Sequence, residues 1–215
     1  MEFALEQLKA LSFGRSRPVI ISDADEVILH FADIFSEYLE TQGMYVNFKS
    51  YAFEGNLKYK DSDEAVGRDL FEAIFNGFFE NYVDKQPLVK NSAENLKSLS
   101  EICDIVIVTN IPHSFADRRR KQLIKQGINY PLITNNGPKG PILNLISKMT
   151  SEKLIFIDDV SHHHKSVAEH VPDSLRIQFI ANNHLNEIED KSEYCQYRCY
   201  NWEEIAKVIR NSLQK

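Results

Sequence analysis

The sequence predicts an α/β fold, in which a doubly wound, Rossmann-like parallel sheet carries a mainly helical cap domain. Short apolar runs rich in β-branched residues alternate along the chain with helical patterns, which is the order in which parallel sheets are built. One long stretch, residues 31–88, breaks that rhythm. The chain has 215 residues, of which 43% are hydrophobic, so we expect one large domain or one domain with an insertion.

The first predicted element is a short amphipathic helix within residues 1–13, which precedes a turn at residues 14–18. Five buried strands are then expected, because each is a short apolar run bounded by turn or polar residues. These strands are predicted at residues 18–23, 103–109, 130–134, 153–159 and 175–181. Helical patterns are found at residues 92–101, 115–126, 141–149 and 162–170.

Residues 31–88 carry two apolar helix faces and no convincing buried strand between them. The first face is formed by Phe31, Ile34, Phe35, Tyr38 and Leu39, and the second by Leu70, Phe71, Ile74, Phe75, Phe78, Phe79 and Tyr82. Residues 42–68 contain three glycines and many charged side chains, which predicts a loop-rich middle. We therefore expect a catalytic core of residues 1–30 and 89–215 and a helical cap of residues 31–88.

Charge and hydropathy exclude several classes of partner. Asp and Glu number 31 against 25 Lys and Arg, and this net charge of -6 would repel a nucleic acid. The longest apolar runs, such as residues 105–108 and 154–157, are far shorter than the roughly 20 residues of a membrane span. We expect no nucleic-acid or membrane partner, while the oligomeric state stays open.

The expected location is the cytoplasm. Glu2 and Glu6 fall where a secretory signal would have a basic start and an unbroken apolar stretch. The three cysteines, Cys103, Cys195 and Cys199, are an odd number and too few for a disulfide scaffold in a chain of this length.

Polar residues stand at the ends of the predicted strands, where open parallel sheets bind their ligands. Asp23 and Asp25 end the first strand, Thr109 and Asn110 the second, and Asp158 and Asp159 the fourth, while Lys139 follows the third. So many carboxylates in one place require a divalent cation between them. Oxygen ligands without thiolate or imidazole favour Mg²⁺ over zinc.

These residues resemble the four motifs of the haloacid dehalogenase superfamily of phosphotransferases, in the order of that family. Asp23-Ala-Asp25-Glu-Val27 matches the first motif, Thr109 the second, Lys139 the third and Asp158-Asp159 the fourth. The resemblance spans about residues 17–182, and residues 31–88 sit where the family places its helical type of cap. The segment that starts at Gln86 looks like the return from cap to core.

The resemblance implies a Mg²⁺-dependent phosphatase that acts on a small phosphorylated metabolite. Asp23 would attack phosphorus and form an aspartyl-phosphate, and Asp25 would protonate the leaving oxygen and then take a proton from water. The implied phosphate-binding residues are Thr109, Asn110 and Lys139, and the implied metal site comprises Asp23, the backbone carbonyl of Asp25, Asp159 and, in support, Asp158. A phosphotransferase or mutase with the same core residues is an alternative, as is a non-catalytic binding module.

Two positions depart from the family pattern. Glu26 follows the second aspartate, where many members have Gly, and Val160-Ser-His162 follows the acidic pair in place of a third carboxylate. Other conspicuous features have simpler interpretations. We expect residues 162–164, three histidines, to start a helix, residues 118–121 to form a solvated helix face, and the phenylalanines after residue 70 to form the core of the cap.

The cap loop would set substrate specificity, since the core residues recognise only the phosphate. Aromatic side chains in this loop can stack on a base or a sugar, and basic side chains can meet a second anionic group. The aromatic candidates are Phe48, Tyr51, Phe53 and Tyr59, and the basic candidates are Lys49, Lys58, Lys60 and Arg68.

Overall fold

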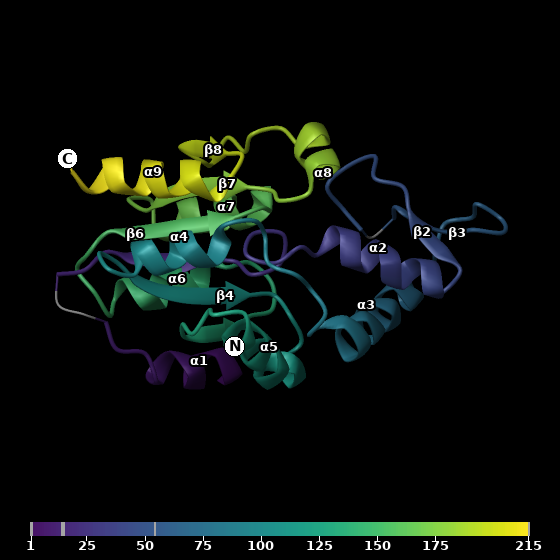
Figure 1. The fold of residues 1–215 in the computed structure, drawn as a ribbon, viewed down its shortest axis with the longest axis horizontal. Coiled ribbons are helices and arrows are strands. Elements are labelled where there is room, and N and C mark those ends of the chain that lie inside the picture. Colours follow the sequence, from purple (N-terminus) through teal and green to yellow (C-terminus); the bar gives the residue numbers. More distant parts are fainter. Residues whose placement is uncertain (1, 14–15, 54, 215) are drawn as a thin grey trace.

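A six-stranded parallel sheet forms the centre of the computed structural model, which describes residues 2–13, 16–53 and 55–214 (Figure 1). The strand order is β5-β4-β1-β6-β7-β8, and every pairing within it is parallel. The α/β fold predicted from the sequence is therefore confirmed. The strands are β1 (Val19–Ser22), β4 (Asp104–Thr109), β5 (Leu132–Thr134), β6 (Leu154–Asp158), β7 (Leu175–Phe179) and β8 (Tyr197–Cys199).

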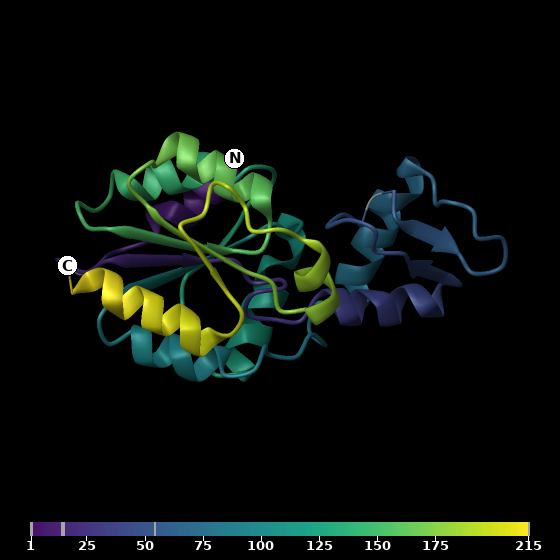
Figure 2. The same cartoon turned by 90° about the horizontal axis from the view of Figure 1, so that it is seen from above.

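Helices cover both faces of the sheet, as Figure 2 shows from above. On one face lie α1 (Glu2–Lys9), α6 (Gly140–Ser147) and α7 (Ser161–His170), and on the other α4 (Ser92–Leu99), α5 (Ala116–Lys125) and α9 (Trp202–Leu213). Successive strand side chains point to opposite faces, so Ile20 packs with the α9 side while Val19 and Ile21 pack with the α1 side.

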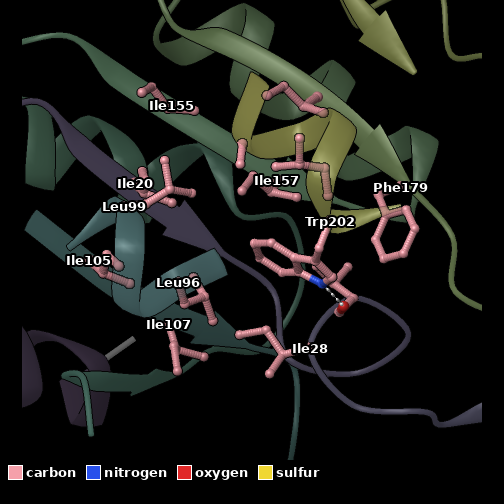
Figure 3. Packing of buried hydrophobic residues seen from close by; sticks show 14 of the residues in the cluster. Ile20, Ile28, Leu96, Leu99, Ile105, Ile107, Ile155, Ile157, Phe179 and Trp202 are labelled. Atoms are coloured by element: carbon pink, nitrogen blue, oxygen red, sulfur yellow. Dashed lines mark hydrogen bonds between the residues drawn. The ribbon is translucent and has the colours of Figure 1, made fainter. Parts of the chain in front are cut away.

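Trp202, at the start of α9, is fully buried among branched aliphatic side chains of the sheet and α4 (Figure 3). Its indole Nε1 donates a hydrogen bond to the backbone oxygen of Val27 at 3.0 Å. A buried indole N–H needs such a partner. This contact fixes the loop that follows β1 against the C-terminal helix.

The inserted residues 31–88 lie beyond the carboxyl ends of the strands, away from the sheet (Figures 1 and 2). They form α2 (Ala32–Thr41), α3 (Arg68–Tyr82) and a two-stranded antiparallel hairpin of β2 (Met44–Val46) and β3 (Leu57–Tyr59). The two helices are at the predicted apolar faces. The stretch of residues 42–68 was predicted to be loop-rich and without a buried strand, and the hairpin within it was missed because strands of three residues are too short to show alternation.

The insertion is joined to the sheet domain by two chain segments that run side by side. The backbone nitrogen of His30 donates to the oxygen of Pro87 at 3.0 Å, and that of Val89 donates to Ile28 at 2.8 Å. Leu29 and Leu88 form an isolated antiparallel bridge between them. The insertion buries its own aromatic cluster, which also contacts Ile111, the second residue after β4.

Some C-terminal elements have no counterpart in the sequence prediction. These are α8 (Asn183–Ile188), the edge strand β8 and α9, and a 3-10 turn at His113–Phe115 precedes α5. Within the described residues, no helix combines the length and the apolar character that crossing a membrane requires.

Candidate active site

Asp23 and Asp25 lie in a tightly wound loop at the carboxyl end of β1. The backbone nitrogen of Asp23 donates to the oxygen of Ile157 at 2.9 Å, which continues the β1–β6 pairing by one residue. The oxygen of Ala24 then accepts from both Ile28 and Leu29 at 2.9 Å. The chain thus turns immediately after Asp23 and holds its carboxylate at the edge of the sheet.

Lys139, at the N-terminus of α6, bridges the carboxylates of Asp23 and Asp158. Its side chain is fully buried, and its Nζ lies 2.9 Å from Asp23 Oδ1 and 2.7 Å from Asp158 Oδ2. Burial alone would lower the pKa of Lys139, but Asp158 and Asp23 raise it above its ordinary value, so the ammonium stays charged.

Gly140 allows this approach of α6. A Cβ at Gly140 would lie 2.3 Å from the backbone oxygen of Ser166 in α7, closer than real Cβ atoms come to backbone. The absence of a side chain at position 140 therefore lets Lys139 reach the sheet edge between two closely packed helices.

The two acidic residues at the end of β6 differ in their partners. Asp158 uses both oxygens, since Oδ2 accepts from Lys139 and Oδ1 from the backbone nitrogen of Val160. Asp159 Oδ2 accepts from the Tyr51 hydroxyl, whereas its buried Oδ1 has no partner among the described residues. Asp159 is therefore the member of the pair with an oxygen available to a ligand.

Asp23, Asp158 and Asp159 each offer a carboxylate oxygen within 4.8 Å of the others, and all three are buried. Burial raises the pKa of Asp23 to about 7, although Lys139 lowers it. Burial and the charge of Asp158 also raise the pKa of Asp159 well above its ordinary value. Buried carboxylates that are this costly to ionise, one with an orphaned oxygen, fit a hard cation such as Mg²⁺.

Thr109 and Asn110 end β4 beside this group. Thr109 is fully buried, and its hydroxyl donates to Asp25 Oδ2 at 3.3 Å. The Asn110 amide nitrogen donates to the oxygen of Gly137 at 2.9 Å, and its side-chain oxygen accepts from Asn135 at 3.0 Å. All the residues that the motifs identified are therefore brought together at the carboxyl ends of β1, β4 and β6 and at the start of α6.

The Asp25 carboxylate is bound by a residue of α5 and by a residue of the segment that returns from the insertion. Arg119 Nη2 lies 2.9 Å from Asp25 Oδ1 and donates to Gln86 Oε1 at 2.7 Å. The Gln86 amide nitrogen in turn donates to Asp25 Oδ1 at 2.6 Å. Asp25 is thus held by a buried cation and by an amide of the segment that returns from the insertion.

The expectation that residues 118–121 form a solvated helix face is wrong for Arg119, which is fully buried. Arg119 lies three residues after Ala116 and four before Leu123, and both of these are also buried. That spacing is the sequence signal that places Arg119 on the inner face of the helix. The contact of Gln86 with Asp25 has no comparable signal, because it depends on the path of the returning chain.

Glu26, which stands where the resembling family often has Gly, has a structural role in this chain. Its backbone is left-handed, with φ of 63°, a conformation that favours Gly and costs a residue with a Cβ. Its buried carboxylate accepts hydrogen bonds from the backbone nitrogens of Phe31, at 3.3 Å, and Ala32, at 2.6 Å. The side chain therefore satisfies donors at the start of α2, which a Gly cannot do.

A cavity of about 410 Å³ opens between the sheet edge and the insertion. Asp23, Asp25, Glu26, Asn110 and Asp159 line the end at the sheet, with His162 and His163 of α7 beside them. Phe31, Phe53, Phe71, Phe75 and Phe79 line the end at the insertion, together with Tyr51. Some of the α3 phenylalanines predicted to be cap core therefore also face the cavity, whereas Phe78 is fully buried.

Comparison with known proteins defines the class of fold. No protein-family model matches the sequence, and no curated protein sequence matches it. Solved structures do match: a haloacid dehalogenase family hydrolase from Deinococcus radiodurans, with bound phosphate and sodium, superposes with a TM-score of 0.62 at 10% identity. The match covers 93% of this chain and 97% of that one.

Two further structures agree. A haloacid dehalogenase-like protein of unknown function from Agrobacterium tumefaciens has a TM-score of 0.63 at 13% identity, covering 93% of this chain and all of that one. A predicted phosphoglycolate phosphatase from Haemophilus somnus has a TM-score of 0.60 at 13% identity, covering 89% and 97%. The chain therefore has the fold of the haloacid dehalogenase-like hydrolases, over nearly the full length of these proteins.

Proposed function

We propose that the protein is a Mg²⁺-dependent phosphatase that hydrolyses a small phosphomonoester through an aspartyl-phosphate on Asp23. The observation that supports this most directly is the bridge from Lys139 to Asp23 and Asp158, with Thr109 bonded to Asp25 and Asn110 in the same cavity as Asp23. An acidic nucleophile, a fixed cation and polar groups at strand ends are the parts that phosphoryl transfer needs.

The nucleophile is one particular oxygen of Asp23. Lys139 and the backbone nitrogen of Ala24 both contact Oδ1, at 2.9 and 2.7 Å. None of the described residues donates to Oδ2, so Oδ2 is the oxygen that attacks. A bond forms between Oδ2 and phosphorus as the bond from phosphorus to the ester oxygen breaks. The attacked phosphoryl group then lies near Lys139, Thr109 and Asn110.

Asp25 moves the protons in both halves of the reaction. It gives a proton to the leaving alcohol oxygen in the first half and takes one from the attacking water in the second. The phosphoaspartate is then cleaved between phosphorus and Oδ2, which restores Asp23 and releases inorganic phosphate. Arg119 and Gln86 keep the Asp25 carboxylate in one place throughout.

The residues that would hold Mg²⁺ are Asp23, Asp159 and the backbone carbonyl of Asp25, with Asp158 in support because Lys139 already engages it. Bound there, Mg²⁺ offsets the charge of the carboxylates and of the phosphate oxygens, so that the anionic substrate can approach.

Residues 31–88 serve as the cap over the site in this proposal. They lie beyond the strand ends and supply the apolar end of the cavity. The two side-by-side connections at residues 28–31 and 86–91 are the hinge through which substrate is admitted and water is later excluded.

The experiment is hydrolysis of an aryl phosphate with and without Mg²⁺. We expect activity to disappear with a chelator and to return when Mg²⁺ is added, since the clustered carboxylates otherwise repel the substrate. Full activity after exhaustive chelation would contradict the metal assignment. Incorporation of ¹⁸O from labelled water into the released phosphate separates hydrolysis from transfer to another acceptor, the alternative that the same residues would serve.

A further inference from the structure

The two ends of the cavity differ in chemistry in a way that limits the substrate. The sheet end carries the carboxylates and amide that a phosphate and a cation require, while the insertion end presents five phenylalanine rings. Phe71 and Phe75 are stacked, with centroids 5.7 Å apart, and Phe31 and Phe53 meet edge to face at 5.3 Å. The alcohol part of the ester must therefore lie against aromatic rings.

No lysine or arginine lines this cavity among the residues that the structure describes. Lys139 is already paired with Asp23 and Asp158, and Arg119 with Asp25. None of the basic candidates in the insertion, Lys49, Lys58, Lys60 and Arg68, lines this cavity, and two of them are engaged elsewhere, Lys58 with Asp63 and Lys60 near Glu40. A second anionic group on the substrate would consequently find no cation at the aromatic end.

The other titratable groups that line the cavity, mostly at its sheet end, do not supply a positive charge either. Burial lowers the pKa of His162 below its ordinary value and that of His163 to about 3, so both imidazoles are neutral at physiological pH. The other titratable residues there, Glu26 and Tyr51 among them, are acidic. A carboxylate of the substrate buried against the phenylalanine rings would therefore be unpaired, which is strongly unfavourable.

A second cavity of about 350 Å³ shares Phe71, Phe75 and Asn110 with the first. It adds the asparagines Asn76, Asn135 and Asn136, together with Glu72 and His113. Aromatic faces together with amide donors and acceptors suit a flat ring with polar edges. Each of the two cavities is of the size that ligand pockets usually have.

We propose that the substrate is a phosphomonoester of an uncharged alcohol that carries an aromatic or heteroaromatic ring. This inference rests on the proposed phosphatase function and deepens it. The ring packs against Phe71 and Phe75 while the phosphate lies at the sheet edge. Esters that bear a carboxylate or a second phosphate on the alcohol part are rejected, and so are ring-free sugar phosphates, which leave the aromatic surface uncovered.

The first test compares matched esters on the wild-type protein with saturating Mg²⁺. The probes are 2-phenylethyl phosphate, 2-(4-carboxyphenyl)ethyl phosphate and glucose 6-phosphate, in which the leaving oxygen is in each case that of a primary alcohol. We expect kcat/KM for the phenylethyl ester to exceed that for each of the others at least about tenfold. Equal or faster hydrolysis of the carboxylated ester or of the sugar phosphate would overturn the inference.

The second test introduces a lysine among the phenylalanine rings at the insertion end of the cavity. Phe71→Lys should raise the efficiency on the carboxylated ester relative to the plain ester by about tenfold or more. Leu70→Lys is the matched control, because Leu70 is the preceding residue of α3 and is exposed, and it should leave that ratio unchanged. An unchanged ratio in folded Phe71→Lys would show that the alcohol does not reach this wall.

The outcomes separate this inference from the function on which it depends. If the protein hydrolyses none of the esters, nor an aryl phosphate, the phosphatase proposal is wrong and this inference falls with it. If it hydrolyses them and prefers charged or ring-free esters, the phosphatase proposal stands and the assigned substrate class is wrong.

Discussion

The two ends of the cavity are built in opposite ways. One end is the sheet edge, where Asp23, Asp25 and Asp159 follow the strands, and the other is the aromatic wall, formed by the phenylalanine rings of the insertion. At the sheet edge, polar groups from separate strands are locked to one another, as Lys139 is to Asp23 and Asp158. In the wall, rings from α3 and nearby segments of the insertion meet through apolar contact alone. Directional contacts make the edge intolerant of change, whereas the wall tolerates replacement and so can determine selectivity.

The largest effect should come from the edge. Asp23→Asn is expected to abolish turnover, because the amide is nearly isosteric but is not a nucleophile. The Asn side-chain oxygen can still accept from Lys139, so the fold should survive, which circular dichroism would check. The assay is release of phosphate from 2-phenylethyl phosphate, with Asp117→Asn, at an exposed position of α5, as the control.

Near wild-type turnover in Asp23→Asn would remove Asp23 from the nucleophilic role. It would also contradict the contrast between the two ends of the cavity, since the sheet edge would then tolerate substitution as the aromatic wall does.

A smaller effect is expected from Arg119→Gln, which removes the buried cation beside Asp25. We expect kcat to fall about 10- to 100-fold with little change in KM, because a misplaced acid and base slows the chemistry and spares binding. Arg119→Lys should recover part of the loss by keeping the charge. Arg120→Gln, on the exposed side of the same helix, is the matched control.

A rise in KM with unchanged kcat would contradict this positioning role for Arg119. The same result would show that Arg119 acts on substrate binding. The network of directional contacts at the sheet edge would then not extend to α5.

The smallest effect concerns Tyr51, where the insertion reaches across to the edge. Its hydroxyl donates to Asp159, so Tyr51→Phe should weaken Mg²⁺ binding about tenfold through the loss of an orienting contact. Isothermal titration calorimetry measures this directly. Tyr45→Phe is the control, because it removes a hydroxyl that also donates to a carboxylate, Asp63, within the insertion. Unchanged Mg²⁺ affinity in Tyr51→Phe would show that metal binding at the sheet edge does not depend on this contact from the insertion.

The parts of the molecule that sequence could predict are those in which a local pattern fixes the position. Strands β1, β4 and β6 are apolar runs, and the residue after such a run must lie at the carboxyl edge, so Asp23, Asn110 and Asp159 were all predictable. β8 was not, because it has three residues and Tyr197 is exposed, so no buried run marks it.

Contacts between distant segments lie beyond such patterns. Gln86 and Arg119 reach Asp25 across 61 and 94 residues of sequence, and nothing near Asp25 indicates either partner. The α3 phenylalanines give a second example, since the sequence does not show which of them are buried and which line the cavity. Phe75 and Phe78 belong to one helical stripe and both contact Phe35 of α2, yet Phe78 is fully buried while Phe75 lines the cavity.

The paired connection at Leu29 and Leu88 has a consequence for how this protein can vary. Because the chain leaves the sheet domain and returns at hydrogen-bonded neighbours, a tight turn of a few residues would close the gap. We therefore expect that residues 31–85 can be lengthened or shortened without a change in the order or register of the strands, whereas Gln86 must stay because it holds Asp25. The topology of the sheet domain in this sense does not depend on the size of the insertion.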